Sequence, residues 1–445
     1  MSVLRARKPD KIMAVIKKGA ELRVFMNASR VGTLERKPSG RLIFTYHPVW
    51  IAHHDTLPIS LSLPVREESY SDHRPEAFFD NLLPDNTEVR RRIAATLGAG
   101  DSSIFELLRV IGRDCVGALQ FVAKDGPVPH REPVSGRLIS TKEIEKTLRG
   151  LLWHPQGSDS EPFRISLAGA QHKTAFLHLK NQWAIPTTST PTTHIFKPPI
   201  GKLPNGIDLS SSVENESLCL QLAEKLGLAV ANARMHTFGQ ERCLVVERFD
   251  RRWSSDGKYL DRLVQEDLCQ ALAVPSFKKY ESHGGPGIIS IMRFLDRSDL
   301  RDKDRATFMR AQIAYFLLAA IDGHGKNFSI HLTKTGFRLA PLYDILSVFP
   351  AMAKNQILRK NVKFAMAVGD SRHYNLGVIQ KRHWFETAKK CGFDPRQLQE
   401  IIDDLIARAD DIQKSAPALL SKFPSNIGQF ILSGMAAQVK RLQAD

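Results

Sequence analysis

Cysteine is scarce in this sequence and is scattered. The 445 residues contain five cysteines, at Cys115, Cys219, Cys243, Cys269 and Cys391. Structural zinc sites need cysteines in close pairs, and disulfide scaffolds need many of them in a short chain. The sequence therefore predicts reduced thiols and gives no support for a zinc centre.

Long apolar runs are also missing. The longest, AQIAYFLLAAI, begins at Ala311 and ends before Asp322, which is well short of the roughly 20 residues that span a bilayer. The basic start, MSVLRARKPDK, lacks the apolar core of a signal peptide. We therefore expect a cytoplasmic protein with no membrane partner.

A glycine-rich phosphate loop is the third absence. In ISLAGAQHKTAF, residues 165–176, a single glycine precedes Lys173, so the segment does not match the pattern that ends in Gly-Lys-Ser/Thr. Its small residues could still let backbone amides approach a phosphate. At this point the segment is either a plain hairpin or an unusual phosphate loop.

Basic residues are in excess. Lys and Arg number 63 against 47 Asp and Glu, a net charge of +16, which favours polyanionic partners such as nucleotides or nucleic acid. The length allows two or three domains. Hydrophobic periodicity predicts an α+β module over residues 1–123, a linker and helix over 124–160, a β-rich part over 161–250 and a mainly helical part over 251–445.

Asp322 and Asn327 carry the most informative spacing. In AAIDGHGKNFSIHL they are separated by four residues, as are the base and the metal-binding amide of a protein-kinase catalytic loop. Asp344, at the end of an apolar run in LAPLYDILSVFP, could add a second oxygen ligand for Mg²⁺. Taken singly, Asp322 is better explained as a cap of the preceding helix and Asp344 as a turn former.

Lys197 ends the apolar segment THIFKPP, where a kinase places the lysine that neutralises phosphates. Glu214 and Glu216 begin the next predicted helix, and we expect Glu216 to pair with Lys197, although first-turn acids also complement the helix dipole. Residues 247–249 of CLVVERFDRRW could contact adenine. The order of these features along the chain is the order found in kinases.

These segments resemble the HipA-type serine/threonine kinases, the toxins of bacterial toxin–antitoxin pairs. The matching motifs are FFDNLLPDN, IGRDCVGAL, SLAGAQHKTA, PTTHIFKPPIG, VERFDRRW, QEDLCQ, KYESHGGPG, DGHGKNFS and YDILS. The resemblance implies an α+β, bilobal protein-kinase-like fold, with a small β-rich lobe and a mainly helical lobe, behind an N-terminal α+β module.

The resemblance also implies roles for residues. Asp322 would be the catalytic base, Asn327 and Asp344 the Mg²⁺ ligands, and Ser166 a site of autophosphorylation that disables ATP binding. Contacts to ATP would come from Ala168, Gly169, Ala170, Gln171, His172, Lys173, Lys197, Glu247, Arg248, Phe249, His324, Lys326, Asn327, Tyr343 and Asp344.

Partners follow from the same resemblance. The family kinase phosphorylates an aminoacyl-tRNA synthetase, glutamyl-tRNA synthetase in one branch, and so stops translation. It is held by a HipB-like helix-turn-helix antitoxin dimer that binds operator DNA, which would bring this chain to the nucleoid mainly through the antitoxin. Two alternatives stay open: a DNA-associated corepressor with a vestigial kinase site, and a small-molecule kinase.

Overall fold

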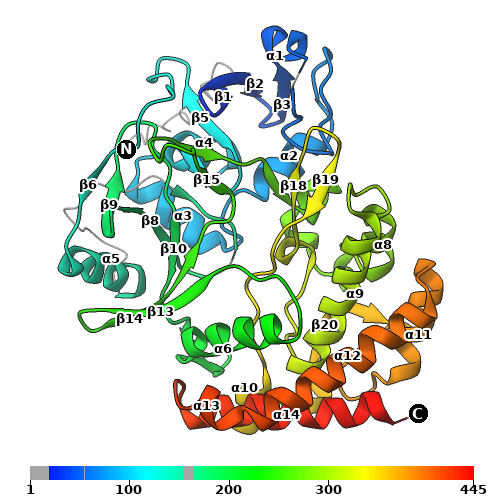
Figure 1. Cartoon of the computed structure of the whole chain (residues 1–445). Helices are drawn as coiled ribbons and strands as arrows, with labels where there is room; N and C mark the ends of the chain where they lie inside the picture. The colour runs from blue at the N-terminus through cyan, green and yellow to red at the C-terminus, as the bar shows by residue number, and fades with distance from the viewer. Residues whose placement is uncertain (1–19, 55, 154–164, 170, 445) are drawn as a thin grey trace, which may run out of the picture.

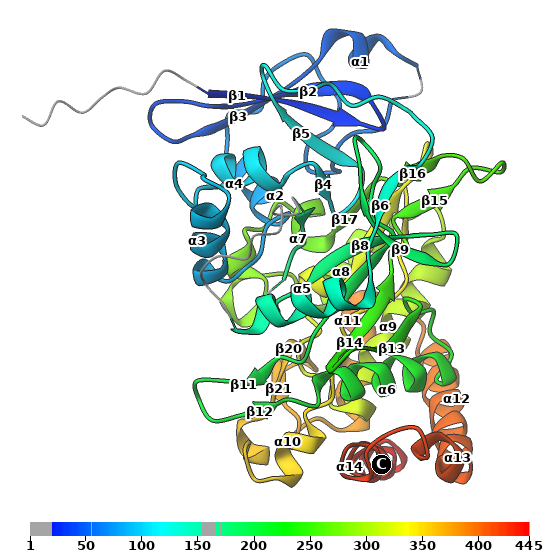
Figure 2. The same cartoon turned by 90° about the vertical axis from the view of Figure 1, so that its left-hand side faces the viewer.

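The computed structural model describes residues 20–54, 56–153, 165–169 and 171–444. Strands and helices are mixed throughout, so the predicted α+β class is confirmed (Figure 1). The N-terminal module lies at one end of the molecule and the C-terminal helices at the other (Figure 2). Within the described residues, no helix is both long enough and apolar enough to cross a membrane.

The N-terminal module is a four-stranded sheet, in the order β3-β2-β1-β5, packed against short helices. In β3, buried and half-buried residues alternate, so Leu42, Phe44 and Tyr46 all point into the core. The elements are β1 (Ala20–Met26), β2 (Ser29–Arg36), β3 (Leu42–Tyr46), α1 (Pro48–Ala52), α2 (Arg74–Asp80), α3 (Thr87–Thr96), α4 (Ile104–Ile111), β4 (Asp114–Cys115) and β5 (Leu119–Ala123).

A second sheet has six strands in the order β13-β14-β10-β8-β9-β6. Its region contains β6 (Gly136–Leu138), α5 (Thr141–Trp153), β7 (Ile165–Ser166), β8 (Thr174–Leu179), β9 (Gln182–Pro186), β10 (His194–Lys197), β11 (Gly201–Lys202), β12 (Asp208–Leu209), α6 (Ser212–Lys225), β13 (Ala233–Phe238) and β14 (Glu241–Glu247). Residues 124–160 are therefore more than the predicted linker and helix, because β6 pairs with β9 and α5 packs on the sheet. A three-residue strand is too short to show a period in the sequence.

The remaining part is mainly helical and is built around α9, whose second half is apolar. Its elements are β15 (Arg251–Trp253), β16 (Leu260–Arg262), β17 (Gln265–Asp267), α7 (Leu268–Ala271), α8 (Ile288–Leu295), α9 (Arg301–Leu318), β18 (Ser329–Leu332), β19 (Phe337–Leu339), α10 (Phe349–Ala353), β20 (Lys363–Val368), β21 (His373–Asn375), α11 (Lys381–Cys391), α12 (Pro395–Lys414), α13 (Ala416–Leu420) and α14 (Ser425–Gln443). Because α9 is buried by α12 and α14, its apolar run is core rather than membrane span.

Buried polar contacts join the N-terminal module to the rest of the chain. The carboxyl group of Glu266, in β17, is fully buried and accepts hydrogen bonds from the Ser60 hydroxyl (2.5 Å) and the Leu61 backbone N–H (2.9 Å). Arg248 likewise donates to Asp250 and to the Cys115 carbonyl, 2.7 Å away. Since unpaired buried polar groups are costly, these bonds hold the module in one fixed position.

Candidate active site

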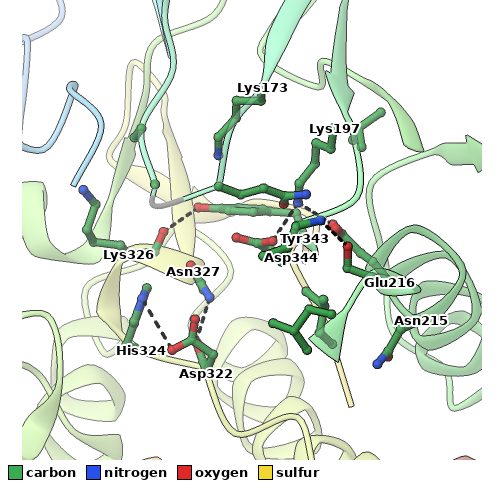
Figure 3. A pocket seen from close by; sticks show the side chains of 18 of the residues that line it. Lys173, Lys197, Asn215, Glu216, Asp322, His324, Lys326, Asn327, Tyr343 and Asp344 are labelled. Carbon is green, nitrogen blue, oxygen red and sulfur yellow. Dashed lines mark hydrogen bonds and ion pairs between the residues drawn. The ribbon is translucent and has the colours of Figure 1, made fainter. Parts of the chain in front are cut away.

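A cavity of about 390 Å³ lies between the six-stranded sheet and the helical part. Figure 3 shows side chains from both parts pointing into it, with Lys173 and Lys197 on the sheet side and Asp322 and Asn327 on the helical side. The cavity therefore brings together segments that the sequence places far apart.

Lys197 links the two sides. Its Nζ, at the end of β10, lies 2.7 Å from Glu216 Oε1 in α6 and 2.7 Å from Asp344 Oδ1. The predicted pairing with Glu216 is confirmed, while the alternative, Glu214, bonds to Arg242 instead. Burial by itself would lower the pKa of Lys197, but the carboxylates of Asp344 and Glu216 outweigh it and raise that pKa, so the lysine stays charged.

Asp344 stands in an unusual backbone conformation. Its φ is 59°, in the left-handed region that residues other than glycine rarely adopt. Burial would raise the pKa of its carboxyl, but the ammonium groups of Lys197 and Lys173 lower it instead, so the group is ionised. Strained backbone of this kind collects at functional sites, where the surrounding structure has to hold it.

The loop after α9 presents Asp322. Ala319 ends the helix with a φ of 47°, which turns the chain into the loop. The Asp322 side chain is 58% exposed to the cavity and solvent. Its backbone carbonyl accepts from Asn327 Nδ2 at 2.7 Å, and its carboxylate Oδ1 accepts from the Tyr280 hydroxyl at 2.5 Å. Asp322 is thus held in place yet open to an incoming group.

The predicted phosphate loop borders the cavity in part. Ala168, Gly169, Gln171 and Lys173 line it, whereas His172 is not among the lining residues and Ala170 lies outside the described residues. Gly169 has a φ of 105°, and a side chain there would come within 2.8 Å of Lys173 Nζ. The positive φ therefore favours glycine at this position.

Ser166 is fully buried at the base of this loop. Its hydroxyl donates to the Leu82 carbonyl of the N-terminal module over 2.7 Å. The serine therefore does not reach the cavity as the loop stands.

Residues 247–249 line the cavity as expected, but they differ in orientation. Phe249 lies beside Tyr343, with ring centroids 5.7 Å apart, and both border the cavity. The guanidinium of Arg248 instead points toward the N-terminal module, where it bonds to Asp114; it also bonds to Asp250 of its own segment and is 1% exposed. Arg248 therefore faces the cavity through its backbone, and the predicted contact of this segment with adenine stays a prediction.

His324, Lys326 and Tyr343 complete the predicted set. All three line the cavity, and the Tyr343 hydroxyl donates to the Lys326 carbonyl at 2.8 Å. Burial lowers the pKa of His324, which favours the neutral imidazole. The ammonium of Lys326 turns away from Asp344, toward the N-terminal module (Figure 3).

Three further residues at the site were not predicted as functional. Asp85, from the N-terminal module, lies 2.6 Å from Lys326 Nζ and 2.7 Å from Lys279 Nζ, and Tyr280 bonds to Asp322. Asp85 and Lys326 are 241 positions apart, so no spacing pattern could have paired them. The available signal was the motif FFDNLLPDN, which ends just after Asp85.

The donor set suits Mg²⁺. Asp344 and Asn327 supply carboxylate and amide oxygens, which are hard ligands of the kind Mg²⁺ prefers. Because Asn327 uses its nitrogen on Asp322, the amide oxygen is not consumed by that bond. Across the described ranges, no cluster of three His, Cys, Asp or Glu could hold a metal by itself. A Mg²⁺ here would need further oxygens from a ligand such as a nucleotide phosphate.

Comparison with known proteins accounts for this arrangement. The model of the HipA-like C-terminal domain matches residues 165–412, more than half of the chain, and that of the HipA N-terminal domain matches residues 22–122. The protein named "Putative kinase Y4mE" of Sinorhizobium fredii is 34% identical over 394 residues, which cover 86% of this chain and 89% of that protein.

Shewanella oneidensis supplies a further relative and a solved structure. Its serine/threonine-protein kinase toxin HipA is 31% identical over 303 residues, 65% of this chain and 67% of the toxin. The structure of HipA from strain MR-1, in a complex with HipB and operator DNA, superimposes with a TM-score of 0.75 at 24% identity and covers 95% of this chain and 96% of that one, so the fold is shared. The chain therefore belongs to the HipA family of serine/threonine protein kinases, which use ATP.

Proposed function

We propose that this chain transfers the γ-phosphate of ATP, in the presence of Mg²⁺, to a serine or threonine of a protein substrate. Residues 161–250 would act as the small lobe of a bilobal kinase and residues 251–445 as the large lobe. The observation that carries the proposal is the position of Lys197, whose ammonium bridges Glu216 and Asp344 at 2.7 Å each. Such a bridge fixes a phosphate-binding cation relative to a metal-binding carboxylate.

The nucleotide would lie along the sheet side of the cavity. Adenine would meet the backbone of residues 247–249 and the ring of Phe249, while Lys197 and Lys173 would face the phosphates. Bound Mg²⁺, held by Asp344 and Asn327, would neutralise charge on the phosphate oxygens. The support for this placement is that each group lines one continuous cavity.

Asp322 would act on the acceptor. The acceptor oxygen forms a bond to the γ-phosphorus, the bond from that phosphorus to the bridging oxygen of ADP breaks, and the hydroxyl proton passes to the Asp322 carboxylate. Its 58% exposure leaves room for a protein segment to approach. Since phosphoryl transfer asks little covalent chemistry of the protein, most of the rate would come from positioning and charge neutralisation.

Ser166 would serve as an off switch. Its hydroxyl is buried against Leu82, so the segment has to leave this position before the serine can accept a phosphate. A phosphate adds roughly two negative charges. Phosphorylated Ser166 could therefore not return to its buried position beside the Leu82 carbonyl oxygen. The phosphate loop would then stay out of place and ATP binding would be lost.

The partners are proposed by analogy with the relatives. The Shewanella HipA is in a complex with HipB and operator DNA, and this chain would bind a HipB-like helix-turn-helix dimer, reach DNA mainly through it, and reside in the cytoplasm and at the nucleoid. Its substrate would be an aminoacyl-tRNA synthetase, with glutamyl-tRNA synthetase as the first candidate, and phosphorylation would halt translation and arrest growth.

A corepressor with a vestigial kinase site is the second candidate, favoured by the net charge of +16. The Lys197, Glu216 and Asp344 contacts are expected for both candidates, because buried charges need partners for stability alone, so phosphoryl transfer itself has to decide between them.

Growth and phosphorylation in bacterial cells test the proposal together. Expression of the chain without its antitoxin is expected to arrest growth and add phosphate to a synthetase, as seen by phosphoproteomics, and Asp322→Gln or Asp344→Ala is expected to abolish both effects. Full arrest by both variants would overturn the kinase mechanism and favour the corepressor.

A further inference from the structure

A short segment of the N-terminal module, residues 82–85, reaches the active site. The Leu82 carbonyl accepts from the Ser166 hydroxyl at 2.7 Å, and the Asp85 backbone N–H donates to the Gly169 carbonyl at 3.2 Å. Pro84 and Gly169 form a parallel β-bridge between these bonds. The module therefore contacts the phosphate loop directly through its backbone.

The side chain of Asp85 extends the contact to the catalytic loop. Its Oδ1 lies 2.6 Å from Lys326 Nζ and its Oδ2 lies 2.7 Å from Lys279 Nζ. The three side chains are 14%, 3% and 15% exposed, in the order Asp85, Lys326 and Lys279. Because water is largely excluded, losing the carboxylate would leave two ammonium groups close together without a counter-charge.

Lys279 carries the contact one step further. Its carbonyl accepts from the Gly325 N–H at 3.3 Å, and the next residue, Tyr280, donates to Asp322. Lys326 itself precedes Asn327, the proposed metal ligand. One carboxylate thus bonds to the catalytic loop and to the segment that supports it.

Residues 82–85 are held in place by contacts on both sides. Asn86 caps α3, accepting from the N–H groups of Glu88 and Val89, and Arg90 of that helix donates to the Pro84 carbonyl at 2.6 Å. Asn81 bonds to the carbonyl of Val274, at 2.9 Å, on the helical side. These contacts fix Asp85 from both sides, so the position of its carboxylate follows that of the N-terminal module.

We propose that Asp85 is a positioning residue of the kinase reaction, through which the N-terminal module keeps the phosphate loop and the catalytic loop in their working arrangement. The inference rests on the proposed function and extends it, because turnover would then depend on a residue outside the two kinase lobes. A partner that displaces residues 82–85 would slow the kinase without entering the cavity.

The test is steady-state kinetics on the full chain with Asp85→Asn, which keeps the size and backbone bonds of Asp85 but removes its charge. We expect kcat to fall about 10- to 100-fold, because misplaced catalytic groups slow the chemical step by such factors. The KM for ATP is expected to change less, because Lys197 and Lys173 are unchanged. Asp85→Glu, which restores the charge, is expected to recover part of kcat. Asp72→Asn is the matched control, since Asp72 pairs with Arg74 at 2.7 Å in the same module, away from the cavity.

Three outcomes separate the possibilities. A low kcat for Asp85→Asn at an unchanged melting temperature, with partial recovery in Asp85→Glu, supports the proposal. Wild-type kcat for Asp85→Asn, or a loss of kcat that only follows a lowered melting temperature and that Asp85→Glu does not relieve, overturns it while leaving the proposed function standing. A wild-type chain that transfers no phosphate overturns both.

Discussion

The hydroxyl of Tyr280 donates a hydrogen bond to Oδ1 of Asp322 over 2.5 Å. The Tyr280 ring is held by His324, with ring centroids 5.0 Å apart in an edge arrangement. Burial raises the pKa of Tyr280, and the Asp322 carboxylate raises it further, so the phenol keeps its proton and remains a donor. Asp322 is thereby restrained in one orientation, and under the proposed function its second carboxylate oxygen would take the proton of the substrate hydroxyl.

Removal of this hydroxyl should therefore slow the chemical step. A hydrogen bond to a charged group contributes about 1.5–3 kcal/mol, so we expect Tyr280→Phe to lower kcat by about tenfold or more while leaving the KM for ATP unchanged. Steady-state kinetics with varied ATP will measure both constants. A kcat equal to that of the wild type would mean that Tyr280 does not orient the base.

Ser166 should be dispensable for the first turnovers but needed for self-inactivation. Its hydroxyl donates one buried hydrogen bond, to the Leu82 carbonyl. Ser166→Ala removes the hydroxyl that would receive the phosphate and adds no bulk. We expect the variant to start at the wild-type rate and to stay active over time, whereas the wild-type rate decays as the serine is phosphorylated. Immediate loss of activity in Ser166→Ala would instead assign the serine a structural or catalytic role.

The lowered pKa of Lys173 predicts that kcat/KM for ATP depends on pH. Burial, with a smaller contribution from Lys197, lowers the pKa of Lys173 from 10.5 to about 8. The lysine is charged below this pH and neutral above it, so kcat/KM for ATP should fall as the pH rises past about 8.

Lys173→Arg is the control for that profile, because arginine keeps its charge at these pH values. The variant should show no fall near the pKa of the lysine. If the wild type and the variant lose kcat/KM at the same pH, another group is responsible.

The raised pKa of Glu266 predicts that the stability of the fold depends on pH. Burial raises the pKa of its carboxyl from 4.5 to about 8. At pH values between these two pKa values, the folded chain holds a proton on Glu266 that the unfolded chain has released. The free energy of unfolding therefore falls as the pH rises through this range. Glu266→Gln mimics the protonated form, and we expect its melting temperature to exceed that of the wild type by a margin that grows from about pH 4.5 to about pH 8. A constant difference over that range would contradict this linkage.

The residues with proposed catalytic roles could be predicted from the sequence more fully than the contacts that hold them in place. Lys197, Asp322, Asn327 and Asp344 each stand in a local segment whose apolar pattern gives the position of a strand or helix end. Their order along the chain then matched a known arrangement, and the Lys197 pairing with Glu216 is present in the structure. The individual roles of these residues in catalysis stay predictions.

The supporting contacts could not be predicted because they join distant segments. Asp85 meets Lys326, Ser60 meets Glu266, and Arg248 turns toward the N-terminal module. Local periodicity specifies which face of an element is buried but not which element covers it. The strand β6 was missed for a related reason, since its pairing with β9 is fixed by the sheet.

The decisive measurement for kinase activity is transfer of labelled γ-phosphate from ATP by the purified chain, with Mg²⁺ present or removed by a chelator. We expect label on the protein or on an added aminoacyl-tRNA synthetase only when Mg²⁺ is present, and none with Asp322→Gln or Asp344→Ala at an unchanged melting temperature. Absence of label from the wild-type chain, or undiminished label with both variants, would contradict the proposed kinase mechanism.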